Sequence, residues 1–205
     1  MDFGCAAYCK YAEQCLGDLP PELLAQRNEL LKDRVALEMK HLFKQDFKRI
    51  GHATKVARYA EQIVKEEKGD LAIVLSAAYL HDIGMKEAET RYQSTESKYQ
   101  EELGPPIARE ILSRLGANPG LIEEVCDIIG HHHHPRPEEA ANFKAVYDAD
   151  MIVNLEENQK EWNLSPEKLG AVIEKNLFTE SGRNLARKTL FAVETAKGAE
   201  KKPLG

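Results

Sequence analysis

The sequence lacks any apolar run long enough to cross a lipid bilayer, which takes about 18 consecutive apolar residues. Its most apolar stretch, from Leu71 to Leu80, is far shorter and is typical of a buried core helix. The opening residues, "MDFGCAAYCK", lack the basic stretch and the apolar run of a secretory signal. We therefore expect a cytoplasmic protein with no membrane partner.

Positive charge is also in short supply, with 28 lysines and arginines against 34 acidic residues and a net charge of −6. This balance offers no broad basic field to nucleic acid, so we expect no nucleic-acid partner. The chain contains neither the G-x-x-x-x-G-K-[ST] loop of P-loop ATPases nor the G-x-S-x-G pattern of nucleophile-triad hydrolases. Both enzyme classes are therefore unsupported.

Cysteine is scarce: the chain has Cys5, Cys9, Cys15 and Cys126. In a reducing compartment these are expected to be thiols or ligands rather than disulfides. The spacing of the first three, C-x3-C-x5-C, is not a common zinc pattern. We interpret residues 1–20 as a leader with free thiols. The alternatives are a small metal or iron–sulfur site completed by Cys126 or a histidine, and redox or homodimer chemistry.

Helical periodicity is abundant by contrast. An apolar fraction of 42% in 205 residues suits one domain with its own core. We predict an all-α bundle of about seven helices, with residues 21–200 as a single domain and a polar loop after the central apolar helix. The predicted helices span 21–43, 47–69, 70–85, 105–116, 121–134 and 142–159, with two more between about 163 and 197; residues 86–104 form the predicted loop.

Several ionisable residues fall on otherwise apolar helix faces. His52 is in phase with Val56 and points where the apolar residues point, and His81 and Asp82 end the most apolar helix. Each would be costly to bury alone. Imidazoles and carboxylates from separate helices can instead share one or two cations, as in many helical bundles.

A further acid belongs with this group. Asp150 lies seven residues after Phe143 and therefore faces the core with it. Asp148 is its rival, but helical phase turns Asp148 away from that face. The sequence therefore favours Asp150 as the partner of the buried histidines.

The order H…HD…D resembles that of the HD-domain superfamily of metal-dependent phosphohydrolases. The matching stretches are "GHATKVARYA", "AAYLHDIGM" and "VYDADMIVNL", within residues 44–155. The resemblance implies an HD-domain-like helical bundle. It also implies one divalent metal ion (Mn, Fe, Co, Ni, Mg or Zn) held by His52, His81, Asp82 and Asp150.

Four consecutive histidines stand in "IIGHHHHPRP". By similarity to two-metal HD proteins, the HD-GYP phosphodiesterases and HD oxygenases, His131 and His132 would hold a second cation or a substrate phosphate. Helical phase instead allows His132 and His133. The two-metal relatives carry another histidine where this chain has "YQEELGPP", which offers only Glu101 or Glu102 as substitutes. A second cation therefore stays an alternative.

The implied reaction is hydrolysis of a phosphomonoester or phosphodiester, with a nucleotide as the expected small-molecule substrate, by metal-activated water. Asp82 would hold the cation and orient the water. His131 or His132 would stabilise the phosphate or protonate the leaving oxygen.

Phosphate also calls for cationic side chains. We predict Lys86, Arg91 and Arg136 as substrate-binding residues, with Lys86 foremost because only three residues separate it from Asp82. Two other functions stay open: an HD-type di-iron oxygenase, and a non-catalytic metal- or nucleotide-sensing module whose cysteine-rich leader is the active part.

Overall fold

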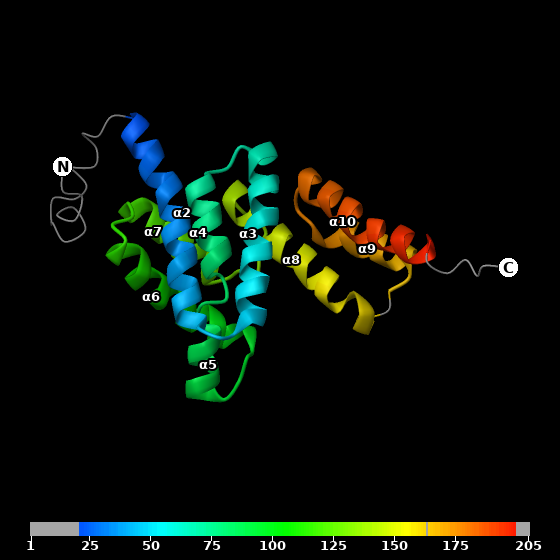
Figure 1. Ribbon diagram of the computed structural model, residues 1–205, viewed down its shortest axis with the longest axis horizontal. Helices are drawn as coiled ribbons and strands as arrows, with labels where there is room; N and C mark the ends of the chain where they lie inside the picture. Colours follow the sequence, from blue (N-terminus) through cyan, green and yellow to red (C-terminus); the bar gives the residue numbers. More distant parts are fainter. Residues whose placement is uncertain (1–20, 163, 200–205) are drawn as a thin grey trace.

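The computed structural model describes residues 21–162 and 164–199, and these residues fold into α-helices joined by turns, with no strand among them. The predicted all-α class is confirmed. The leader with Cys5, Cys9 and Cys15 lies outside the described residues. The helices, drawn in Figure 1, are α2 (Pro21–Phe43), α3 (Phe47–Glu67), α4 (Leu71–Leu80), α5 (Met85–Tyr92), α6 (Ser97–Arg114), α7 (Pro119–Ile129), α8 (Ala141–Trp162), α9 (Pro166–Asn176) and α10 (Glu180–Ala199).

Helix α4 lies at the centre of the bundle. It packs against α2, α3, α7 and α8, and nearly all its side chains are buried. The helix begins where predicted, because the Asp70 carboxylate accepts hydrogen bonds from the backbone N–H groups of Ala72 (2.8 Å) and Ile73 (3.1 Å). It ends at Leu80, so His81 and the residues after it occupy a turn instead of the predicted last helical turn.

The predicted loop over residues 86–104 was wrong, because this segment forms α5 and the first half of α6. Helix α6 continues through Pro105 and Pro106. Because proline lacks a backbone N–H donor and is tolerated in the first turn of a helix, the sequence predicts that a helix begins at Pro105. Close packing of α6 against the turn after α4, described below, favours the continuous helix.

Helix α10 packs against α3, α8 and α9, and α9 and α10 form the C-terminal part of the bundle (Figure 1). The buried Asp148 carboxylate ties α8 to the turn between them. It accepts hydrogen bonds from the N–H groups of Phe178 and Thr179, both at 2.8 Å, and from the Thr179 hydroxyl at 2.6 Å. Asp148 faces away from Asp150, as predicted, but the side of α8 that carries Asp148 is also buried, which helical phase alone did not predict.

None of the helices in residues 21–162 and 164–199 is both long enough and apolar enough to span a lipid bilayer.

Candidate metal centre

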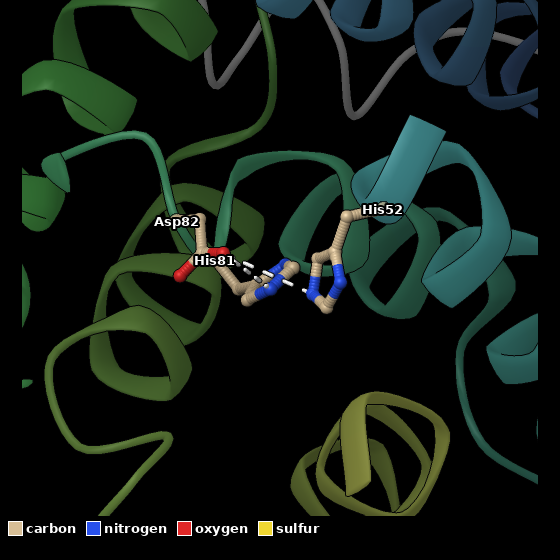
Figure 2. A group of neighbouring side chains, drawn as sticks. All are labelled: His52, His81 and Asp82. Atoms are coloured by element: carbon tan, nitrogen blue, oxygen red, sulfur yellow. Dashed lines mark ion pairs between the residues drawn. The ribbon is translucent and has the colours of Figure 1, made fainter. Parts of the chain in front are cut away.

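Four predicted ligands come together from three parts of the bundle. His52 comes from α3, His81 and Asp82 from the turn after α4, and Asp150 from α8. Asp150 Oδ1 lies 3.0 Å from His52 Nε2 and 3.6 Å from His81 Nε2. Asp82 Oδ2 lies 3.3 Å from His81 Nε2 and 3.9 Å from His52 Nε2. Figure 2 shows the two rings and the Asp82 carboxylate pointing toward one another.

The buried imidazoles leave nitrogen atoms without partners inside this cluster. His81 Nδ1 donates to the Ala78 carbonyl at 2.9 Å, and His132 Nδ1 donates to the Ile129 carbonyl at 2.8 Å. Both Nε2 atoms are buried and have no hydrogen-bond partner among the described residues. A buried polar atom without a partner costs free energy. A divalent cation beside His52, His81 and Asp82 would satisfy the His81 nitrogen, so the residues present fit a metal ion.

Asp82 belongs to two potential ligand groups. His52, His81 and Asp82 offer atoms that lie within 4.8 Å of one another, and so do Asp82, His132 and His133. Oδ2 of Asp82 faces the first group, while Oδ1 lies 3.7 Å from His132 Nε2. The second group uses the histidine pair that helical phase allowed.

The other two histidines of the run are not brought into the cluster. His131 donates from Nδ1 to the Asp127 carbonyl, pairs through Nε2 with Glu139 (3.0 Å) and stacks on Phe143 with ring centroids 4.5 Å apart. His134 pairs with the Glu101 carboxylate. The predicted roles of His131 in metal binding and catalysis therefore have no counterpart in its placement.

Glu101 holds the histidine run in place rather than joining the metal group. Its Oε1 accepts from the backbone N–H of His133 at 2.8 Å, and its Oε2 pairs with His134 Nδ1 at 2.7 Å. Because Glu101 lies on α6, this contact ties the turn after α7 to α6.

The cluster is strongly coupled electrostatically. Burial alone would lower the pKa of His81, but the charges of Asp82 and Asp150 raise it to about 10. Burial likewise opposes the raised pKa of His52, which its hydrogen bond to Asp150 produces. Burial alone would raise the pKa of Asp82, but His81 and His132 hold it well below its usual range. Burial opposes the lowered pKa of Asp150 as well, which its hydrogen bond to His52 produces. Both carboxylates therefore stay ionised at neutral pH and attract positive charge.

A cavity of about 390 Å³ opens beside the cluster. Lys48 and Arg49 are the cationic side chains among the described residues that line it. Arg49 is held by the Glu89 carboxylate, with Nη1 3.0 Å from Oε2 and Nη2 2.5 Å from Oε1, and by Asp46 at 2.9 Å. The lining residues are Asp46, Lys48, Arg49, His52, Asp82, Met85, Thr95, Gln100, His133, Asp150, Asn154, Glu157 and Asn158.

The predicted substrate-binding cations do not line this cavity. Lys86 donates to the Leu42 carbonyl at 3.2 Å, Arg91 pairs with Glu87, and Arg136 pairs with Asp127. All three side chains are exposed.

Sequence reasoning missed the two cations that do line it. Lys48 and Arg49 precede His52 by four and three residues and therefore share its helix face. That helical spacing was the signal that could have found them. Closeness in sequence to Asp82, which favoured Lys86, proved less informative.

Comparison with known proteins agrees with this geometry. The sequence profile of the HD domain matches residues 49–173. Among solved structures, a predicted HD superfamily hydrolase from an uncultured Thermotogales bacterium aligns with a TM-score of 0.59 and 24% identity, over 80% of this chain and 87% of that one. Bacillus subtilis YpgQ aligns with a TM-score of 0.58 and 20% identity, over 85% and 96%. At these identities the structural matches show a shared fold. No curated protein matches the chain significantly.

Proposed function

Because this chain belongs to the HD-domain family, a family of metal-dependent hydrolases, we propose that it hydrolyses a phosphomonoester or phosphodiester, with a nucleotide as substrate. One observation carries the proposal. The buried Nε2 atoms of His81 and His132 have no hydrogen-bond partner among the described residues, and both lie beside the Asp82 carboxylate. Asp82 lines a cavity that is also lined by the cationic side chains of Lys48 and Arg49.

In this proposal His52, His81, Asp82 and Asp150 hold one divalent cation, which is Mn, Fe, Co, Ni, Mg or Zn. When bound, such a cation supplies Lewis-acid activation of water and neutralises charge on a phosphate. Imidazole and carboxylate ligands suit these metals. The ionised Asp82 carboxylate would accept a hydrogen bond from the attacking water and thereby orient it.

His132 is the proposed proton donor to the leaving oxygen. Its Nδ1 is fixed on the Ile129 carbonyl, so only Nε2 can exchange a proton with a substrate. Asp82 Oδ1 lies 3.7 Å from that nitrogen. Where a second cation binds, His132 and His133 would hold it together with Asp82.

Lys48 and Arg49 are the proposed phosphate-binding residues. Arg49 is immobilised by Glu89 and keeps its charge near Asp82, which further raises its pKa. Lys48 is exposed at the cavity and can follow a substrate as it binds. A phosphate between these side chains and a cation held by the cluster would meet positive charge on both sides.

The test is an activity screen against nucleotide monoesters, diesters and triphosphates, after chelation and separate addition of Mn, Mg, Ni, Co, Fe and Zn. We expect hydrolysis with at least one metal, and its loss in His81→Ala and Asp82→Ala. His41→Ala, which removes an exposed imidazole on α2, is the matched control and should retain activity. Hydrolysis that survives both cluster substitutions would rule out the assigned site.

The sharing of Asp82 between two ligand groups also supports a second candidate, a di-iron oxygenase on the same fold. Oxygen consumption by the iron-loaded protein, without phosphoester hydrolysis under any metal, would favour that alternative.

A further inference from the structure

His52 differs from the other buried histidines in the partner of its Nδ1 atom. His81 and His132 donate to backbone carbonyls three residues earlier, because each ring lies in a turn just after a helix. His52 lies inside α3, where the carbonyls of the preceding turn are already used by the helix. Its Nδ1 instead lies 3.2 Å from the Glu157 carboxylate on α8.

Glu157 lies on the same face of α8 as the proposed ligand Asp150. Asp150, Asn154 and Glu157 are spaced at i, i+4 and i+7, so they line one side of the helix. Asn154 Nδ2 donates to Asp150 Oδ1 at 3.0 Å. Asp150 therefore approaches the Nε2 edge of the His52 ring, while Glu157 approaches the Nδ1 edge.

The position of Glu157 determines what it can do. It lies on the opposite ring edge from Nε2, so it does not face the cation group that Nε2 faces. As acceptor for the Nδ1–H group, it would keep that proton on Nδ1 and leave the Nε2 lone pair to a cation bound between the ring, Asp82 and Asp150. A carboxylate partner also makes the ring a stronger ligand than a carbonyl partner does.

We propose that Glu157 is a positioning residue that sets the strength of cation binding through His52. The inference rests on the proposed function only in taking His52 as a cation ligand. In this inference the Glu157 carboxylate orients the His52 ring, as the backbone carbonyls of Ala78 and Ile129 orient the rings of His81 and His132.

The competing explanation is that Glu157 merely ties α3 to α8. Three variants separate the two. Glu157→Leu removes the acceptor, Glu157→Gln keeps an acceptor oxygen without the charge, and Glu156→Gln makes the same charge change one residue earlier. Glu156 bonds to the Tyr59 hydroxyl and to Lys55, both at 2.9 Å, and does not line the cavity.

The measurements are calorimetric titration of the chelator-treated full chain with Mn²⁺ and with Zn²⁺, without substrate, and thermal melting of the metal-free variants. We expect Glu157→Leu to weaken cation binding by about 10- to 100-fold. Glu157→Gln should weaken it less, because its amide oxygen still accepts from Nδ1–H. Glu156→Gln should bind as the wild type does.

Each other outcome overturns the inference in a recognisable way. Wild-type affinity in Glu157→Leu overturns it and leaves the proposed hydrolase function standing. A lower melting temperature with unchanged cation affinity shows a helix tie and nothing more. Failure of the wild-type chain to bind Mn²⁺, Zn²⁺ or any other of the proposed cations, titrated in the same way, overturns both proposals together.

Discussion

At the scale of single residues, His131 and His132 are neighbours with opposite surroundings. Both nitrogens of His131 are engaged, and its ring stacks on Phe143. His132 is buried, and its Nε2 atom is directed at Asp82 without a hydrogen bond. The first arrangement stabilises a loop, whereas the second leaves a nitrogen available for chemistry.

We therefore expect His132→Ala to lower kcat/KM by about 100-fold or more, because it removes the proposed proton donor. His131→Ala should leave kcat/KM close to that of the wild type. It should reduce the free energy of unfolding by about 1 kcal/mol through lost stacking on Phe143. Steady-state kinetics and urea titration measure the two effects. Equal losses of activity in both variants would contradict this division of roles.

The limits of sequence reasoning at this scale have a physical cause. The resemblance and the helical phase of Asp150 brought His52, His81, Asp82 and Asp150 into one group, and the structure places them together. The histidine run was harder, because α7 ends at Ile129 and helical phase does not continue into a turn.

At the scale of elements, the turn after α4 is shaped by its contact with α6. A Cβ atom added to Gly84 would lie 2.5 Å from the Gln100 carbonyl oxygen and 2.6 Å from the Gly104 nitrogen. Gly84 has an ordinary φ of −74°, so close backbone approach, and not conformation, is what requires glycine there. The same turn carries His81 and Asp82.

Gly84→Ala should accordingly push the turn away from α6. We expect it to reduce the free energy of unfolding by about 1–3 kcal/mol, as overpacking does, and to weaken cation binding by displacing two ligands. Gly170→Ala in α9 is the control, because a Cβ atom there meets nothing within 4 Å and helix propensity favours alanine. Urea unfolding and calorimetry test both variants. Wild-type stability in Gly84→Ala would show that the approach is looser than described.

This contact also explains which elements the sequence predicted poorly. A helix with a capping residue and many apolar side chains, such as α4 with Asp70, begins where expected. The first half of α6 is polar and precedes Pro105, so local pattern favoured a loop. Its helical form depends on packing against a turn about twenty residues earlier, which local periodicity does not report.

At the scale of the whole molecule, the candidate ligands come from segments far apart in sequence. His52 and Asp150 lie on different helices, and Asp82 lies in a turn between them in the chain. A bound cation would therefore connect α3, α8 and the turn after α4. Binding to the folded state alone raises stability according to the cation concentration relative to its Kd.

Cation binding should thus raise the melting temperature of the chelator-treated protein. At a concentration 100 times Kd the gain is about 2.7 kcal/mol, which corresponds to roughly 5–10 °C for a chain of this size. Differential scanning calorimetry with and without the metal measures it. Asp150→Ala should lose most of the rise, and an undiminished rise in that variant would place the cation elsewhere.

Helix α8 holds two acids two residues apart, one buried against the C-terminal helices and the other facing the cation cluster. These two contacts fix the rotation of α8 about its own axis. A rotation that brought one carboxylate closer to its partners would move the other carboxylate away from its own. Insertions and deletions should therefore be tolerated in the connection from α8 to α9. One residue inserted within α8 would instead rotate all later side chains of the helix by about 100° about its axis. The phase of α8 is thus constrained by both carboxylates at once.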